Sequence, residues 1–154
     1  MLALNNVKIK FGGLVAVDDL SFTINKNEIF GLIGPNGAGK TTVFNMISGV
    51  YKPTEGQISF HGKRIDGKRP YQINALGIAR TYQNINLFKN MTVLENVVVG
   101  CHSRSHSGIF ASILRISSQR KEEERIREKS FEILKFFGLD KKANLPACSL
   151  SYGE

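Results

Sequence analysis

The stretch with the clearest chemistry is rich in glycine and ends in a lysine and two threonines. Residues 34–41 match the pattern G-x-x-x-x-G-K-[ST] at every specified position. A triphosphate is a dense anion, and a loop that wraps around it must point several backbone N–H groups inward, which side chains would obstruct. The sequence therefore predicts that ATP is bound by Gly34, Pro35, Asn36, Gly37, Ala38, Gly39, Lys40, Thr41 and Thr42. These residues are called the phosphate-binding loop below.

Each polar residue of the phosphate-binding loop has a separate expected role. Lys40 would reach the β- and γ-phosphates, the Thr41 hydroxyl would ligate Mg²⁺, and Thr42 would donate to the α-phosphate. The helix that follows would present its positive N-terminal end to the phosphates. The alternative is a glycine-rich turn that binds nothing, and the order of strand, motif and helix argues against it. The glycine spacing does not fit the G-x-G-x-x-G pattern of dinucleotide-binding proteins.

The composition narrows the class of protein without deciding the function. The net charge of +8 permits nucleotides, nucleic acid or anionic lipid headgroups as partners. No arginine-rich tract or aromatic-basic interleaving of the kind that reads RNA or single-stranded DNA is present, and the charge alone does not decide between these partners. We expect no nucleic-acid partner, an expectation that rests on the resemblance given below. No apolar run reaches the roughly 18 residues of a membrane helix, and the N-terminus does not read as a signal peptide. These features predict a cytoplasmic, globular protein.

The phosphate-binding loop needs elements on both sides to hold it. Alternating apolar residues predict strands over 4–11 and 15–24. The almost wholly apolar run 28–33 predicts a central strand buried on both faces, directly before the loop. A helix over 40–50 should follow the loop and pack on the sheet, with Gly49 ending it.

The chain beyond residue 56 is predicted to contain two more strands and several helices. Strands are predicted over 57–65 and 78–83, with a short helix over 70–76 between them. Thr92 and Glu95 have the spacing of a capping box, which would open a helix that runs to about Gly100. A long helix is predicted from about Ser118 to Phe137, with a packing stripe of Ile126, Ser130, Ile133, Leu134 and Phe137.

With the phosphate-binding loop in place, the chain resembles the ATP-binding subunits of ABC transporters. The resemblance rests on residues 11–13, the loop, residues 80–83 and residues 150–154. It implies an α/β P-loop NTPase fold of ABC type, with an N-terminal antiparallel β subdomain, a P-loop core sheet and an α-helical subdomain. The nucleotide-binding core would cover about residues 1–83, and the helical subdomain about 84–154.

The resemblance also assigns roles to single residues. An aromatic residue of the first sheet stacks on adenine in that family, and Phe11 occupies its place; by itself, Phe11 would read as an ordinary strand residue. Gln83 matches the glutamine that contacts magnesium and the attacking water, a task that suits a neutral amide. Asn84–Phe88, which follows it, would contact the transmembrane permease subunits.

The last five residues resemble the ABC signature, most often written L-S-G-G-Q. In the family, this loop leads into a helix whose N-terminus faces the γ-phosphate of ATP held by the partner subunit. A second ATPase subunit, identical or different, is therefore implied, with Ser151 and Gly153 as donors. Two residues depart from the commonest form, Tyr152 and Glu154. The stretch comprises Leu150, Ser151, Tyr152, Gly153 and Glu154.

A finer resemblance is to the ATPase of branched-chain amino acid importers. Residues 11–17, 80–88 and 91–96 carry it, together with an additional segment from Gly108 to Arg120. It implies an energy-coupling subunit at the cytoplasmic face of the plasma membrane, which uses ATP binding and hydrolysis to drive transport. The family relationship alone indicates the solute, because an ATPase subunit does not touch it.

No residue of the chain is assigned a certain catalytic role. Hydrolysis needs an acidic residue at the end of an apolar strand beyond the phosphate-binding loop, and no such pattern is found. We therefore expect a chain truncated before the Walker B strand, and we expect the 154 residues alone not to turn over ATP. The alternatives are a soluble ABC-type ATPase that acts on ribosomes or nucleic acid, a non-hydrolysing or degenerate fragment, and a P-loop nucleotide kinase. Residues 150–154 argue against the kinase, and a second phosphate-binding loop further along the gene would favour the soluble ATPase.

Overall fold

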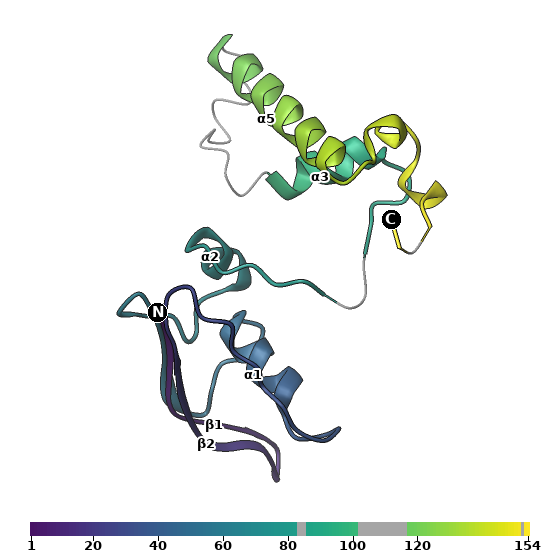
Figure 1. Cartoon of the computed structure of the whole chain (residues 1–154). Helices are drawn as coiled ribbons and strands as arrows, with labels where there is room; N and C mark the ends of the chain where they lie inside the picture. The colour runs from purple at the N-terminus through teal and green to yellow at the C-terminus, as the bar shows by residue number, and fades with distance from the viewer. Residues whose placement is uncertain (83–85, 102–116, 152) are drawn as a thin grey trace. The chain divides into compact units, whose positions relative to one another are not determined.

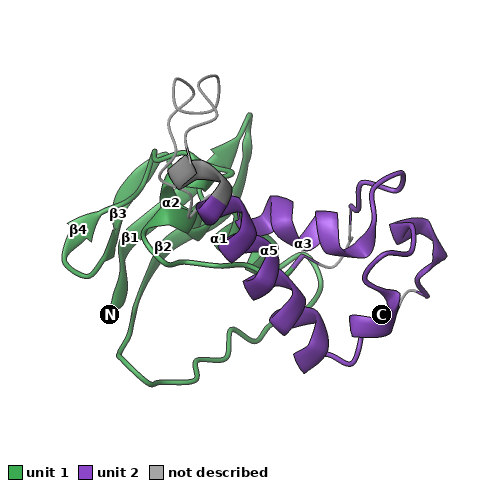
Figure 2. Ribbon diagram, turned by 90° about the horizontal axis from the view of Figure 1, so that it is seen from above, with its two compact units in different colours: residues 1–81 green, residues 82–154 purple. Residues whose placement is uncertain are grey.

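The structure is a computed structural model that describes residues 1–82, 86–101, 117–151 and 153–154, with the backbone alone for 117–120 (Figure 1). The chain divides into two compact units, Met1–Thr81 and Tyr82–Glu154, which Figure 2 colours separately. Each unit has its own hydrophobic cluster.

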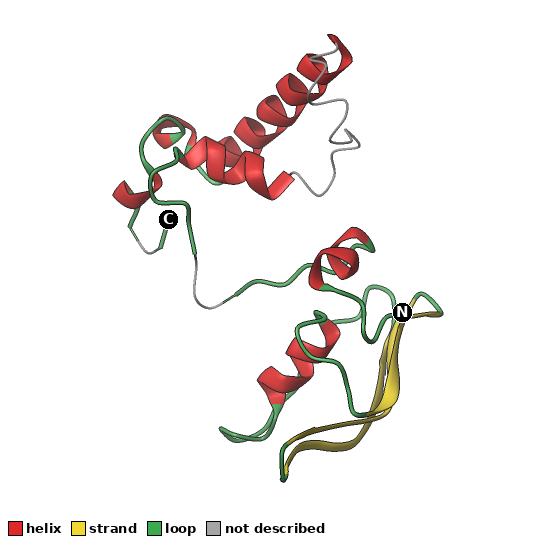
Figure 3. Ribbon diagram, turned by 180° about the vertical axis from the view of Figure 1, so that it is seen from behind, coloured by secondary structure: helices red, strands yellow, loops and turns green. Residues whose placement is uncertain are grey.

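Unit 1 contains a four-stranded antiparallel sheet with the strand order β2-β1-β3-β4. Its strands are β1 (Leu2–Phe11), β2 (Leu14–Ile24), β3 (Glu55–Phe60) and β4 (Lys63–Arg64) (Figure 3). The first two confirm the strands predicted over 4–11 and 15–24. A tight turn joins them, and Gly12 in this turn has a φ of 57°, in the left-handed region that glycine adopts readily.

The single strand predicted over 57–65 is wrong, because the segment folds back on itself as the β3–β4 hairpin. Ser59 pairs with Arg64, and Phe60 pairs with Lys63. The two turn residues, His61 and Gly62, both have positive φ values, 49° and 75°. Two consecutive left-handed residues are what a two-residue hairpin turn of type I′ requires. The apolar alternation alone did not indicate this reversal.

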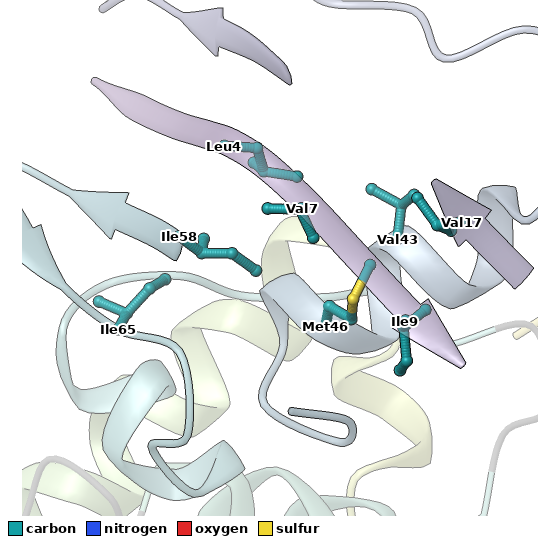
Figure 4. Packing of buried hydrophobic residues seen from close by; sticks show 8 residues of the cluster. All are labelled: Leu4, Val7, Ile9, Val17, Val43, Met46, Ile58 and Ile65. Atoms are coloured by element: carbon teal, nitrogen blue, oxygen red, sulfur yellow. The ribbon is translucent and has the colours of Figure 1, made fainter. Parts of the chain in front are cut away.

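The helix α1 (Lys40–Ile47) packs on the sheet, and α2 (Pro70–Ala75) follows β4. Both helices were predicted, and α1 ends before Gly49, which has a φ of 77°. The core of unit 1 lies between α1 and the sheet, as Figure 4 shows. Its buried members are Leu4, Val7, Ile9, Val17, Val43, Met46, Ile58 and Ile65.

The two remaining strands predicted in unit 1 do not form. Residues 28–33 have no strand conformation, Ile33 is 94% exposed, and Ile29 is exposed as well. A strand buried on both faces needs a neighbouring strand and a covering layer, and no strand among the described residues pairs with this run. Residues 78–82 also lie outside any strand, while Gln83 falls outside the described residues.

Unit 2 is helical among its described residues. It contains α3 (Val93–Cys101), α5 (Ser117–Phe136) and two short 3₁₀ helices, η2 (Asp140–Lys142) and η3 (Ala147–Ser149). The capping box is confirmed, because the Glu95 N–H donates to the Thr92 hydroxyl at 3.2 Å and the Thr92 N–H donates to the Glu95 carboxylate at 2.7 Å. Within the described part of the chain, no helix has the length and apolarity to cross a bilayer.

The packing stripe of α5 is narrower than predicted. Ser130 and Leu134 are buried and Ile126 is half-buried, whereas Ile133 is 37% exposed and Phe137 is 69% exposed. The buried positions are spaced by four residues, which is the row that one neighbouring helix covers. Since α3 packs against α5, the residues beside this row remain in contact with solvent.

Candidate nucleotide-binding site

The phosphate-binding loop depends on glycine at two turn positions in unit 1. Gly37 has a φ of 85° and Gly39 has a φ of 80°, a region that other residues enter at a cost. A Cβ atom on Gly37 would meet nothing within 4 Å, so its glycine serves the backbone conformation alone. At Gly34, a Cβ would lie 3.2 Å from the Cβ of Ala38, which is tighter than ordinary contact.

Gly39 has a second reason to be glycine, because it lies against β2. A Cβ atom there would be 2.5 Å from the carbonyl oxygen of Ala16 and 3.0 Å from Cγ2 of Val17. Only a residue without a side chain permits this approach. The close contact fixes the end of the loop, and hence the start of α1, on the sheet.

The Lys40 side chain folds back over the loop. Its Nζ atom donates to the carbonyl oxygens of Gly34 and Pro35, each at 2.6 Å. The Ala38 N–H donates to the Pro35 carbonyl at 3.2 Å and tightens the same turn. The ammonium group is therefore held at the loop by main-chain acceptors, and no carboxylate of the described residues forms an ion pair with it.

The start of α1 suits an anion. Gly39 is its N-cap, no side chain among the described residues caps it, and its first turn contains no acidic residue. The first-turn N–H groups of a helix have no intrahelical acceptor and carry partial positive charge. Thr41 and Thr42 belong to the first turn of α1, where Thr41 is exposed and Thr42 is half-buried. The residues present thus fit a polyphosphate, and the Thr41 hydroxyl is available to a hydrated cation.

Phe11 lies at the end of β1 and is 43% exposed. Its ring packs edge to face on Tyr51, with ring centroids 5.1 Å apart and an angle of 70° between the ring planes. Sequence reasoning missed Tyr51, because no motif includes it. The signal available was modest: an aromatic residue two positions after Gly49, the glycine that follows α1.

Arg80 is a second residue whose contacts the sequence did not reveal. Its Nη1 atom donates to Oδ1 of Asn45 at 2.6 Å and to Oγ of Ser48 at 3.1 Å; Asn45 lies on α1, and Ser48 is the C-cap of that helix. The chain just before Gln83 is therefore tied to the helix that starts at the phosphate-binding loop. Gln83 itself lies outside the described residues, so its assignment to magnesium and water stays a prediction.

The signature-like residues lie in unit 2, where Glu154 organises them. Its Oε2 atom accepts from the main-chain N–H and from the hydroxyl of Ser151, both at 3.0 Å, and its carboxylate also pairs with Lys142. The Lys142 ammonium, together with these two donors, lowers the pKa of Glu154 to about 2. Leu150 packs against the hydrophobic cluster of unit 2, Gly153 is exposed, and Tyr152 lies outside the described residues.

The segment predicted to contact a permease is partly described. Asn84 and Ile85 fall outside the described residues, while Leu87 and Phe88 are 41% and 57% exposed. The Asn96 side chain holds Phe88 at both main-chain groups: Oδ1 accepts from the Phe88 N–H at 2.9 Å, and Nδ2 donates to the Phe88 carbonyl at 3.1 Å. This arrangement fixes the backbone of an exposed aromatic residue.

The chain matches a protein-family model and a curated relative. The family model described as ABC transporter matches residues 17–154. The chain is 40% identical, over all 154 residues, to the high-affinity branched-chain amino acid transport ATP-binding protein LivG of Salmonella typhimurium, and it spans 60% of the length of that relative.

Two solved structures are similar as well. The ADP conformation of MJ1267, an ATP-binding cassette of an ABC transporter, superposes with a TM-score of 0.77 at 38% identity and covers 99% of this chain and 59% of that one. The dimeric structure of MJ0796, a bacterial ABC transporter cassette, gives a TM-score of 0.74 at 27% identity and covers 99% of this chain and 64% of that one. The α/β fold of the ABC ATPases, implied by the sequence, is thereby confirmed.

The loop geometry in unit 1, the family match and the structural similarity all agree, and the chain belongs to the ABC transporter family.

Proposed function

We propose that this chain forms the nucleotide-binding part of the energy-coupling subunit of an ABC importer for branched-chain amino acids. The observation that carries the proposal is the uncapped start of α1 behind a glycine turn, with Lys40 held over that turn by two carbonyl oxygens. The printed name of LivG supports the choice of solute class. The chain spans about 60% of the length of that relative, so ATP hydrolysis and transport are proposed for the whole subunit.

In the proposed site, different residues contact different parts of the nucleotide. The phosphate-binding loop holds the phosphates, with Lys40 on the β- and γ-phosphates and Thr42 on the α-phosphate. Thr41 and Gln83 would hold Mg²⁺, which would offset the negative charge of the phosphates. Phe11 receives the adenine base. None of these roles requires movement of α1, because its N-terminal amides already lack intrahelical acceptors.

The signature residues act on a second nucleotide in this proposal. Two cassettes would form the working dimer, an arrangement supported by the dimeric MJ0796 structure. Ser151 and Gly153 would donate to the γ-phosphate of ATP held by the partner cassette. The subunit would lie at the cytoplasmic face of the membrane, with residues 84–88 against the permease.

The first test is nucleotide binding by the 154-residue chain with a fluorescent ATP analogue in the presence of Mg²⁺. Lys40→Ala should weaken binding at least about tenfold, because the ammonium contact with the β- and γ-phosphates is lost. Lys26→Ala is the matched control, since Lys26 is an exposed lysine of the same unit and lies outside the loop. Equal affinity of the Lys40→Ala chain and the unsubstituted chain would refute the proposed site.

The second test concerns the solute. The whole subunit would be reconstituted with its permease partners in vesicles that contain ATP on the cytoplasmic side. ATP-dependent uptake of leucine, isoleucine or valine, abolished by Lys40→Ala, is the expected result. Uptake that does not depend on ATP, or that shows no preference for these amino acids over a basic amino acid, would remove the proposed solute class.

A further inference from the structure

We propose that Tyr51 belongs to the adenine-binding site, where it holds the Phe11 ring in the orientation that receives the base. The inference deepens the proposed function and rests on it, because it names a residue of the same nucleotide site. No motif of the sequence includes Tyr51, and only the fold brings it to Phe11, forty residues earlier in the chain. Tyr51 is a positioning residue in this scheme, and Phe11 makes the contact with the base.

The first support is the geometry of the aromatic pair. The rings meet edge to face, with centroids 5.1 Å apart and an interplanar angle of 70°. Phe11 keeps 43% of its surface exposed and Tyr51 keeps 37%, so the contact covers each ring only in part. A phenylalanine at the end of a strand, without such a neighbour, would be free to change rotamer. A ring already held in one orientation receives a base at a lower entropic cost.

The second support is that the backbone of Tyr51 is anchored to α1. The N–H groups of Val50 and Tyr51 both donate to the carbonyl oxygen of Asn45, at 2.9 Å and 3.1 Å. Gly49, directly before them, has a φ of 77°, and a Cβ atom there would lie 2.6 Å from the carbonyl of Lys68. The backbone conformation after α1 therefore requires glycine at position 49. This conformation fixes the position of Tyr51 relative to α1.

The third support is a second anchor on β1, the strand that carries Phe11. The Thr54 N–H donates to the Lys8 carbonyl at 2.7 Å, and the Lys10 N–H donates to the Thr54 hydroxyl at 3.1 Å. Residues 50–54 thus connect the end of α1 to the last residues of β1. Tyr51 is held from both directions, which is expected of a residue that sets the position of another.

The aromatic pair also lies at the correct end of the sheet. Ile9 pairs with Val17 across the β1–β2 ladder, and Val17 lies against Gly39 of the phosphate-binding loop. Figure 4 shows Val17 near Val43 of α1. Phe11 lies two residues beyond Ile9 on the same face of β1, a step of about 7 Å. A nucleotide with its phosphates in the loop can therefore place its base toward Phe11.

The test separates the base from the phosphates. The 154-residue chain is titrated with ATP and, separately, with inorganic tripolyphosphate, each with Mg²⁺, in competition with a fluorescent ATP analogue. The ratio of the two dissociation constants measures what the adenosine part contributes. In the unsubstituted chain, ATP should bind more tightly than tripolyphosphate.

Tyr51→Leu should reduce this ratio by about threefold to tenfold and leave tripolyphosphate affinity unchanged, because base stacking is weakened and the loop is intact. Phe11→Leu should reduce the ratio at least as much, and the double variant should add little to it. Tyr51→Phe should leave the ratio as it is in the unsubstituted chain, since it keeps the ring that holds Phe11. Tyr71→Leu, which removes an exposed tyrosine of the same unit, is the matched control and should change nothing.

Tripolyphosphate binding also reports that each variant is folded. If Tyr51→Leu weakens ATP and tripolyphosphate equally, Tyr51 has a general structural role and the inference is wrong. If it leaves the ratio unchanged while Phe11→Leu lowers it, Phe11 acts without Tyr51 and the inference is also wrong. Failure of the proposed function gives a different result, namely ATP affinity that does not respond to Lys40→Ala.

Discussion

The Nη1 atom of Arg80 donates a hydrogen bond of 2.6 Å to Oδ1 of Asn45, and it lies 3.1 Å from Oγ of Ser48. Ser48 is buried, and its hydroxyl also donates to the Phe44 carbonyl at 2.8 Å. One guanidinium therefore joins the segment before Gln83 to the last turn of α1 and to its C-cap residue. The phosphate-binding loop begins the same helix, so both parts of the proposed site share one support.

Replacing Arg80 by methionine should destabilise unit 1. The variant leaves the Asn45 side-chain oxygen without its charged donor, a loss of roughly 1–3 kcal/mol in the free energy of unfolding. Urea denaturation followed by circular dichroism measures the shift of the midpoint. Lys63→Met is the control, because Lys63 is an exposed cation on β4. An equal midpoint for both variants would contradict a specific role of Arg80.

Three glycine substitutions should separate backbone strain from steric overlap. Gly39→Ala combines a φ of 80° with a Cβ only 2.5 Å from the Ala16 carbonyl, so it should unseat the loop from β2 and abolish ATP binding. Gly37→Ala has a φ of 85° and free space, so it should cost about 1 kcal/mol of stability and weaken binding less. Isothermal titration with ATP compares them.

Gly13→Ala completes this series as a control, since its Cβ would meet nothing within 4 Å and its φ lies outside the left-handed region. It should bind ATP like the unsubstituted chain. Tighter or equal binding by Gly39→Ala relative to Gly37→Ala would show that the contact with Ala16 does not position the loop.

The Thr92–Glu95 capping box should account for a measurable part of the stability of α3. Thr92→Ala removes the hydroxyl that accepts from the Glu95 N–H and should cost about 1 kcal/mol in the free energy of unfolding. Thr92→Ser keeps the hydroxyl and should stay close to the original value. Thermal or urea unfolding of the two variants gives the comparison, and equal losses would mean that the methyl group, rather than the cap, matters.

The arrangement at Glu154 should depend on pH in a defined direction. Lys142 and the two Ser151 donors favour the charged carboxylate and lower the pKa of Glu154 to about 2. Because the folded-state pKa is lowered, the contribution of this contact to stability is complete above the unfolded pKa, near 4.5, and is lost as the pH falls toward 2. The Ser151 hydrogen bonds should therefore persist at neutral pH.

Carbon-detected NMR titration of the Glu154 carboxyl measures this pKa directly. Lys142→Met should raise the pKa toward the ordinary glutamate value, because the first of its stabilising partners is removed. Lys141→Met, an exposed neighbour, should leave it near 2. A pKa that does not respond to Lys142→Met would show that the ion pair does not form in solution.

The elements that were predicted correctly are those with local causes. The strand β1 follows from residues that alternate along one stretch of chain, and the capping box follows from two residues three positions apart. The phosphate-binding loop, whose contact with a nucleotide stays a prediction, is local in the same way, since its glycines and Lys40 form a contiguous motif. Such features are encoded by near neighbours and need no knowledge of distant contacts.

The wrong predictions have non-local causes. The apolar run 28–33 matches a buried strand in composition, yet a strand requires partners that no single segment can supply, and Ile33 is 94% exposed. The segment 57–65 has a strand pattern at each end, but the left-handed conformations of His61 and Gly62 reverse it into a hairpin. On α5, Ile133 is exposed because α3 covers the row that contains Ser130 and Leu134, and Ile133 lies beside that row.

By itself, the amino-acid sequence determined that this chain belongs with the ABC ATPases and predicted its phosphate-binding loop, because those features lie in short contiguous motifs. Only the tertiary structure decided that Tyr51 packs on Phe11 and that Arg80 reaches Asn45, 35 residues earlier. These contacts join residues that the chain separates widely, and hydrogen bonds and ring packing of this kind are specified only once the sheet and α1 have come together.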